Sequence, residues 1–175
     1  MPPPATPLLT TGRLILSPIG PDDALEMVGV LADPSLYAFT GGHPPNVHQL
    51  EARYRAQVAG SPSNDQVWHN WILRLSGEDV AVGFVQATVT APQANVAWVI
   101  GTDWQGWGLA SEAARAMCRW LLDSGLEELF AHIHPDHVAS QHVAKAVGFT
   151  STGEFDADGE VVWEMTQPLW SSVSR

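Results

Sequence analysis

A glycine loop near the middle of the chain has the residue pattern of a phosphate-binding site. Residues 96–100 form an apolar run short enough for a strand, and Gly106 and Gly108 follow it. From Leu109 onward, apolar residues recur at helical spacing. A helix start exposes unpaired N–H groups and the positive end of the helix dipole, and glycines let a ligand approach the backbone. We therefore expect this segment to bind a phosphate or pyrophosphate, with plain turn chemistry as the alternative.

A dinucleotide-binding fold is a second explanation for the same glycines. Gly106, Gly108 and Ser111 nearly fit the G-x-G-x-x-G pattern, and Glu128 follows at the distance expected for a ribose-binding acid. However, Ser111 takes the place of the third glycine, and that fold places its loop after the first strand of a βαβ series. Here the loop lies past mid-chain, after strands joined by short turns, so we disfavour this explanation.

The elements that position this loop are predicted to form a single α+β domain. Short turns join the predicted strands 67–75, 80–90 and 96–100, which makes them antiparallel neighbours. The expected order is β-α-α-β-β-β-α-β-α-β-β, in a mixed, mostly antiparallel twisted sheet flanked by helices. The other strands are expected at 13–18, 128–133, 149–154 and 160–165, and helices begin near residues 20, 46, 109 and 137. We predict a flexible N-terminal tail at residues 1–10, disordered or clamped, and a domain at 11–170.

Composition and charge narrow the functional classes. A chain of 175 residues suits one domain with a sizeable core. The formal net charge of -11 does not favour nucleic acid, which needs clustered Lys and Arg. It is compatible with a cationic substrate such as an amine, although solubility alone explains such a charge more simply. No apolar run is long enough to span a bilayer, and the pattern of a secretory signal is missing. We expect a cytoplasmic monomer or homodimer that binds neither nucleic acid nor membrane.

Three blocks of sequence resemble the GNAT N-acetyltransferase superfamily. The loop Gln105-Gly-Trp-Gly-Leu-Ala110 resembles its acetyl-CoA loop, Q/R-x-x-G-x-G/A. Residues 134–149, HPDHVASQHVAKAVGF, resemble the next block, which in one branch runs N-x-x-S-x-R-V-x-x-x-x-G-F. Residues 11–16, TGRLIL, resemble the opening strand of that branch, which holds ribosomal-protein N-terminal acetyltransferases and many small-amine acetyltransferases. The blocks occur in the right order and imply a single-domain GNAT fold.

The resemblance also implies how acetyl-CoA is held. The pyrophosphate would bind backbone N–H groups of the loop, at Gln105, Gly106, Trp107, Gly108, Leu109, Ala110 and Ser111. The pantetheine arm would pair with the strand edge at Trp98, Val99 and Ile100, by strand addition. A backbone N–H at an irregularity in this strand, matched by spacing to Trp98, would stabilise the developing oxyanion.

The second block implies a proton donor for the leaving thiolate. In this branch a serine lies near the sulfur, and Ser140 is the matching position, although a helix-surface hydroxyl bonded to the preceding turn is the alternative. Val143 stands where many other members have a tyrosine, so a tyrosine acid is excluded. His137 replaces the asparagine of the block and is expected to donate to the pantetheine. Trp107 and His142 stand where basic residues are common, so two cations expected near the phosphates are missing. Lys145, Arg115 and Arg119 are the candidates to compensate.

The acceptor is expected to bind at His43, His69, Trp71 and Gln86. His43 lies in a rigid loop, His69 and Trp71 share one face of their strand, and Gln86 is a polar residue on a central strand. A histidine suits a general base, with a hydrogen-bonded core histidine or a water chain as alternatives. No Cys or carboxylate completes a compact ligand set with the histidines that follow residue 131, so we expect no metal.

The resulting prediction is an acetyl-CoA-dependent N-acetyltransferase. The acceptor would be a primary amine, on a small molecule or a peptide N-terminus, and it would attack directly in a ternary complex. A non-catalytic acyl-CoA-binding or sensor domain of GNAT fold is the alternative, because the phosphate cations are missing and no base is assigned. An acyl donor longer than acetyl is a third possibility.

Overall fold

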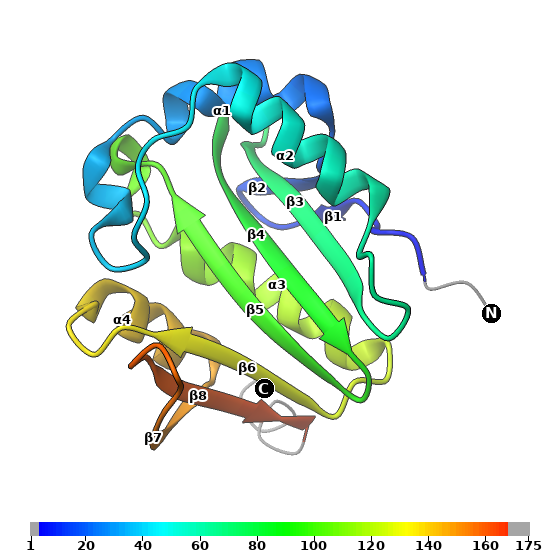
Figure 1. Ribbon diagram of the computed structural model, residues 1–175, viewed down its shortest axis with the longest axis vertical. Helices are drawn as coiled ribbons and strands as arrows, with labels where there is room; N and C mark the ends of the chain where they lie inside the picture. The colour runs from blue at the N-terminus through cyan, green and yellow to red at the C-terminus, as the bar shows by residue number, and fades with distance from the viewer. Residues whose placement is uncertain (1–3, 168–175) are drawn as a thin grey trace.

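The alternating strand pattern produces one mixed sheet of eight strands, seen in the computed structural model, which describes residues 4–167 (Figure 1). The strand order across the sheet is β1-β2-β3-β4-β5-β6-β8-β7. The strands are β1 (Leu9–Thr10), β2 (Leu14–Pro18), β3 (Val67–Leu75), β4 (Ala81–Thr90), β5 (Gln93–Ile100), β6 (Glu128–Ile133), β7 (Thr150–Phe155) and β8 (Val161–Thr166). The helices are α1 (Ala24–Val30), α2 (Val47–Ala59), α3 (Leu109–Asp123) and α4 (Val138–Val147), with 3-10 turns η1 (Pro21–Asp23), η2 (Pro34–Tyr37) and η3 (Thr102–Trp104).

The contact between β5 and β6 is the one parallel pairing among the described strands, and it is short. All the other neighbouring strands pair antiparallel. A parallel pair needs a crossover connection, which α3 supplies between β5 and β6. The two strands pair only from Gln93↔Glu128 to Asn95↔Phe130. Beyond Asn95 they separate, so one edge of β5 has no neighbouring strand (Figure 1).

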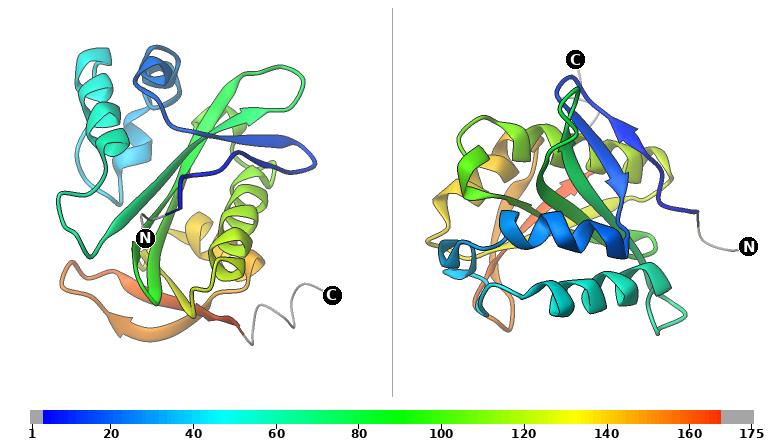
Figure 2. Two further views of the ribbon diagram at one scale, coloured as in Figure 1. Left: turned by 90° about the vertical axis from the view of Figure 1, so that its right-hand side faces the viewer. Right: turned by 90° about the horizontal axis from the view of Figure 1, so that it is seen from above.

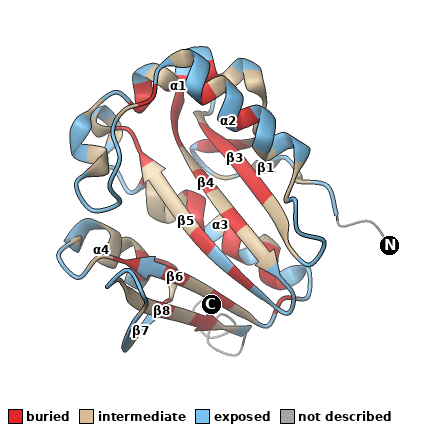
Figure 3. Cartoon of the chain, in the orientation of Figure 1, coloured by how far each residue is buried: buried red, intermediate tan, exposed pale blue. Residues whose placement is uncertain are grey.

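Helices cover both faces of the sheet, which explains why several strands are apolar on both sides. The helices α1 and α2 lie on one face, and α3 and α4 lie on the other (Figures 1 and 2). Successive residues of β3 point to opposite faces, so Ile72 packs in the cluster under α1 and α2, whereas Trp71 and Leu73 pack under α3. Buried positions accordingly run along the central strands and the inner faces of the helices (Figure 3).

The helix termini follow from local sequence. Asn46 caps α2 in a reciprocal capping box, because its side chain accepts from Gln49 N–H and the Gln49 side chain accepts from Asn46 N–H. In α3, residues at helical spacing are buried, among them Leu109, Ala113 and Met117.

No helix within residues 4–167 combines the length and apolar character that crossing a membrane requires.

The N-terminal segment is clamped against the sheet from Thr6 onward. The Thr6 hydroxyl lies 2.9 Å from His69 Nδ1, and Trp71 Nε1 donates to the Pro7 carbonyl oxygen at 2.7 Å. The next residues form β1, which pairs with β2. Residues 6–10 therefore lie against the sheet. Residues 1–3 and the predicted boundary at residue 170 lie outside the described part of the chain.

The predicted α+β fold class is confirmed, with three local differences. The strand β1 was not predicted. The strand β5 begins at Gln93, before the predicted start at Val96, because a tight turn at Ala91 and Pro92 joins it to β4. The irregularity expected near Trp98 is absent from the pairing of β4 with β5, which runs in continuous register from Gly83↔Ile100 to Thr90↔Gln93. Any oxyanion donor on β5 therefore belongs to a regular strand.

Candidate active site

A cavity of about 850 Å³ lies where β5 and β6 separate. Residues from both faces of the sheet line it, because the gap between the strands joins the two faces. Tyr37, Arg53 and Gln86 come from the side of α1 and α2. Residues at the starts of α3 and α4 come from the other side. The volume is within the range of small-molecule sites in proteins.

The open edge of β5 presents backbone groups to this cavity. Gly101 N–H donates to β4 at 2.8 Å. Backbone groups of a strand alternate in direction, so those of Trp98 point away from β4, toward the side that β6 has left. On the same edge, Gln105 Nε2 donates to the Ile100 carbonyl oxygen at 2.9 Å. The N–H and C=O of Trp98 can therefore pair with an extended ligand.

The start of α3 supplies a second set of free backbone groups. The first helical hydrogen bond runs from Glu112 N–H to the Gly108 carbonyl oxygen at 3.1 Å. Within residues 4–167, the N–H groups of Leu109, Ala110 and Ser111 donate to no protein acceptor, and no side chain caps the helix. All three residues line the cavity. Free N–H groups at the positive end of a helix dipole make a site for an anion.

Ser140 and His137 lie together at the start of α4. Ser140 Oγ is 3.4 Å from His137 Nε2, and both residues line the cavity. Phe39, from the segment that follows η2, stacks on His137 with ring centroids 4.6 Å apart and also contacts His134 at 5.1 Å. Burial and then the neighbouring His134 lower the pKa of His137, so its neutral form is favoured. The N-terminal half of the chain thus contacts α4 across the cavity.

His132 lines the cavity but has no free ring nitrogen. Its Nδ1 lies 2.8 Å from Asp156 Oδ2, and its Nε2 lies 3.1 Å from Asn95 Oδ1. A general base needs a nitrogen that can reach the substrate proton. His132 is therefore suited to fixing the position of β6 relative to its neighbours rather than to accepting a proton.

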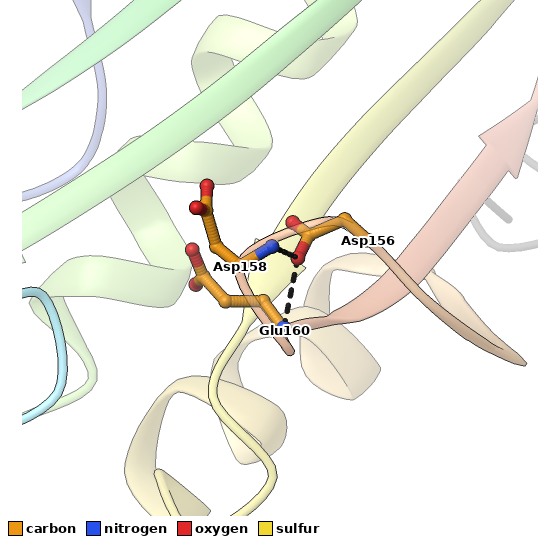
Figure 4. Close-up of side chains that lie close together, drawn as sticks. All are labelled: Asp156, Asp158 and Glu160. Carbon is orange, nitrogen blue, oxygen red and sulfur yellow. Dashed lines mark hydrogen bonds between the residues drawn. The ribbon is translucent and has the colours of Figure 1, made fainter.

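Three carboxylates lie close together in the turn between β7 and β8, and one of them, Glu160, lines the cavity (Figure 4). Oxygens of Asp156, Asp158 and Glu160 lie within 4.8 Å of one another. Asp156 Oδ1 accepts the N–H groups of Asp158 and Glu160, each at 2.9 Å. Glu160 lines the cavity, and burial followed by the charge of Asp156 raises the pKa of its carboxyl group. This end of the cavity is therefore negative.

The structure brings most of the predicted cofactor residues together. The predicted residues that line the cavity are Trp98, Val99, Ile100, Gln105, Gly106, Gly108, Leu109, Ala110, Ser111, His137 and Ser140. Trp107 differs, because the residue is 60% exposed and does not line the cavity. The three cations proposed to compensate for it also lie elsewhere: Arg115 donates to Ala146 O, Lys145 lies over the Trp163 ring, and Arg119 approaches Asp123.

The predicted acceptor residues are not brought together. Gln86 lines the cavity, whereas His43 is exposed outside it. His69 and Trp71 are buried on the α3 face, where both rings contact Trp120 and the N-terminal segment covers them. Burial lowers the pKa of His69. His43, His69 and Trp71 therefore do not line the cavity in which an acceptor could bind.

The acetyltransferase (GNAT) domain family matches residues 13–150, which is well over half of the chain. The chain belongs to the GNAT acetyltransferase family. A comparison with curated protein sequences finds no match.

Solved structures of GNAT proteins share this fold. A GNAT acetyltransferase from Bacillus anthracis has a TM-score of 0.80 at 16% identity, over 93% of this chain and 99% of that one. A Vibrio cholerae protein assigned as a ribosomal-protein-serine acetyltransferase has a TM-score of 0.74 at 20% identity, over 91% and 97%. An aminoglycoside acetyltransferase in complex with coenzyme A has a TM-score of 0.78 at 14% identity, over 93% and 99%. At these identities the likeness establishes the GNAT fold.

Several residues of the GNAT domain's cavity were not singled out from the sequence. Tyr37, Phe39 and Arg53 reach it from the segment around η2 and from α2, and no local pattern marks them as ligand-binding. Glu160 ends a D-A-D-G-E run whose alternating acids were a visible signal. Arg13 was visible in the opening block, but its contact with the glycine loop was not.

Proposed function

We propose that this GNAT domain is an acetyl-CoA-dependent N-acetyltransferase that acts on a primary amine of a small molecule or a peptide N-terminus. One observation carries the proposal: the open edge of β5 at Trp98 and the uncapped start of α3 meet in a single cavity. A strand edge suits the amides of pantetheine, and a helix start suits a pyrophosphate. A ligand that has both parts joined in one molecule fits this arrangement.

The residues present fit acetyl-CoA as the donor. The N–H groups of Leu109, Ala110 and Ser111 have no protein acceptor in residues 4–167 and would bind the pyrophosphate. Relatives of the same fold contain coenzyme A or acetyl-CoA, which supports this choice. When bound, acetyl-CoA supplies an acetyl group activated as a thioester.

The catalytic roles that we propose fall to Trp98 and Ser140. The N–H of Trp98 would donate to the carbonyl oxygen that gains negative charge during attack. Ser140 would give its hydroxyl proton to the departing thiolate and would be reprotonated by the proton that the attacking nitrogen loses as the amide forms. His137 Nε2, at 3.4 Å, would hydrogen-bond the Ser140 hydroxyl between turnovers. No covalent enzyme intermediate is needed, because the amine attacks the acetyl group directly.

An amine acceptor is supported by the negative end of the cavity. Among the described residues that line the cavity, Glu160 alone carries a carboxylate. Its position suits contact with an ammonium group, and its raised pKa suits a carboxylate that removes the ammonium proton before attack. Gln86 would orient the acceptor from β4. A related aminoglycoside acetyltransferase is known in complex with paromomycin and acetyl-CoA, which supports including polyamines among the acceptors tested.

An amine panel tests the proposal. Purified protein is incubated with acetyl-CoA and with diamines, aminoglycosides or peptides that have a free N-terminus, while free thiol and acetylated product are followed. We expect thiol release that requires a free amine, with no release for the same acceptors blocked by N-acetylation. Tight binding of acetyl-CoA without turnover on any amine would favour the non-catalytic sensor domain. Cytoplasmic location and assembly as a monomer or homodimer stay predictions.

A further inference from the structure

The ion pair between Arg13 and Glu112 lies outside the cavity and contacts the glycine loop, residues 105–108. Glu112 Oε2 accepts from Arg13 Nε and lies equally close to Arg13 Nη2, each at 2.7 Å. Glu112 Oε1 accepts from Arg13 N–H at 2.8 Å and from the Thr11 hydroxyl at 2.6 Å. The remaining guanidinium nitrogen, Arg13 Nη1, donates to the Trp107 carbonyl oxygen at 2.8 Å. The residues before β2 are thereby fixed to the loop and to the first turn of α3.

This contact sets the direction of a loop peptide. A trans peptide is planar, and its C=O and N–H point in opposite directions. When Arg13 holds the carbonyl oxygen of Trp107, the N–H of Gly108 must point away from Arg13, and Gly108 lines the cavity. Gln105 is fixed separately, by its bond to the Ile100 carbonyl oxygen, whereas Gly106 and Gly108 have positive φ and no side chain, and Trp107 is exposed.

The pair also controls charge beside the helix start. The Glu112 side chain is 19% exposed, and that of Arg13 is 50% exposed. Burial alone would raise the pKa of Glu112, but hydrogen bonds from Thr11 and Arg13 outweigh it and hold the pKa below the usual range. The carboxyl group is therefore ionised at neutral pH. Without Arg13, it would leave an unpaired negative charge in the first turn of α3, where it would repel a phosphate.

We propose that Arg13 and Glu112 are a positioning pair for the pyrophosphate of the donor, an inference that rests on the proposed function. Arg13 orients the Trp107–Gly108 peptide and neutralises Glu112, and Glu112 in turn fixes the guanidinium. The pair therefore acts on donor affinity through the loop and contacts neither the reacting thioester nor the acceptor. It also supplies a cation near the loop in a chain that has Trp107 where a basic residue is common.

Comparing two acetyl donors of different length distinguishes a role of Arg13 in positioning the pyrophosphate from a general loss of protein stability. Acetyl-pantetheine carries the same thioester as acetyl-CoA but lacks the pyrophosphate and nucleotide. We expect Arg13→Gln to raise the KM for acetyl-CoA by about tenfold or more, the size of a lost charge-assisted contact, with kcat little changed. The same variant should use acetyl-pantetheine as well as the wild type does. Arg13→Lys keeps the charge but lacks the planar guanidinium group, so its KM for acetyl-CoA should lie between those of the wild type and Arg13→Gln.

Matched variants complete the test. Arg13→Gln combined with Glu112→Gln should bind CoA better than Arg13→Gln alone, because the unpaired carboxylate is gone. Arg55→Gln, which removes an exposed arginine paired with Glu51 on α2, should match the wild type. Equal losses with both donors, or an unchanged CoA affinity in Arg13→Gln and Arg13→Lys, would overturn this inference alone. A wild-type protein that binds no CoA would overturn the proposed function together with it.

Discussion

Ser140 Oγ and His137 Nε2 lie 3.4 Å apart in the cavity, one turn from each other at the start of α4. His137 is the residue before the helix, so its ring lies beside the first turn, where Ser140 is found. Because burial and His134 lower the pKa of His137, its ring is neutral at neutral pH and can share a hydrogen bond with the hydroxyl. This contact gives the proposed proton donor a partner that the sequence block alone does not provide.

Ser140→Ala tests the role of this hydroxyl. If Ser140 protonates the thiolate, kcat should fall by about 100-fold or more, whereas acetyl-CoA affinity should change little. Initial rates and calorimetric titration measure the two quantities. Ser124→Ala, at the end of α3, is the control, because its hydroxyl donates to the Trp120 carbonyl oxygen and Ser124 does not line the cavity. Weaker donor binding with an unchanged kcat would make Ser140 a residue that orients the donor.

Gly108→Ala should weaken CoA binding through backbone strain. Gly108 has φ 77°, which an L-residue adopts at a cost of about 1–2 kcal/mol. A Cβ there would lie 3.5 Å from Arg13 Nη2, so it faces the ion pair, and the expected effect comes from strain. Gly29→Ala in α1 is the control, since a Cβ there meets nothing within 4 Å. Calorimetry measures the CoA affinity of both variants, and thermal unfolding measures their stability. If Gly108→Ala binds CoA as tightly as the wild type does, the loop is not part of the CoA site.

Trp107→Arg should tighten CoA binding. Trp107 is 60% exposed as a residue and does not line the cavity, so its replacement costs little packing. A cation there would approach the pyrophosphate and gain about 1 kcal/mol or less, because solvent screens an exposed pair. Titrations at two salt concentrations measure the effect, which should shrink as salt rises. If Trp107→Arg binds CoA more weakly than the wild type does, and the difference does not change with salt concentration, Trp107 packs on the nucleotide.

Acid should destabilise the fold through His69. Burial lowers its pKa from the ordinary 6.5, so the unfolded chain binds more protons than the folded one between the two pKa values. The free energy of unfolding should therefore be highest above pH 6.5 and should fall as the pH drops through this window. His69→Gln should flatten that slope. Urea unfolding at several pH values measures it, and parallel slopes for both proteins would contradict the account.

Local patterns predicted much of the fold. Strand alternation, short turns and the spacing of apolar residues depend on neighbours in sequence, so the order of strands and helices could be predicted. The glycine loop was placed correctly for the same reason: Gly106 and Gly108 mark the start of α3 through their own conformations. The separation of β5 from β6 has no such local mark, because it depends on where the crossover returns the chain.

The acceptor site could not be predicted, because it depends on contacts distant in sequence. Alternation shows that His69 and Trp71 share a face of β3, but it cannot show that Trp120 of α3 and the N-terminal segment cover this face. Phe39 contacts His137 across nearly a hundred residues, and Arg13 contacts Glu112 at a separation of 99. Such pairs follow from the packed fold, and one sequence carries no signal for them.

Two-substrate kinetics test the central claim most directly. Initial rates of thiol release are measured while acetyl-CoA and an active amine from the panel are varied together. Direct attack in a ternary complex predicts intersecting double-reciprocal lines and no acetyl group on protein incubated with acetyl-CoA alone. Parallel lines with a covalently acetylated protein, or no amine-dependent release from a protein that binds acetyl-CoA, would contradict it.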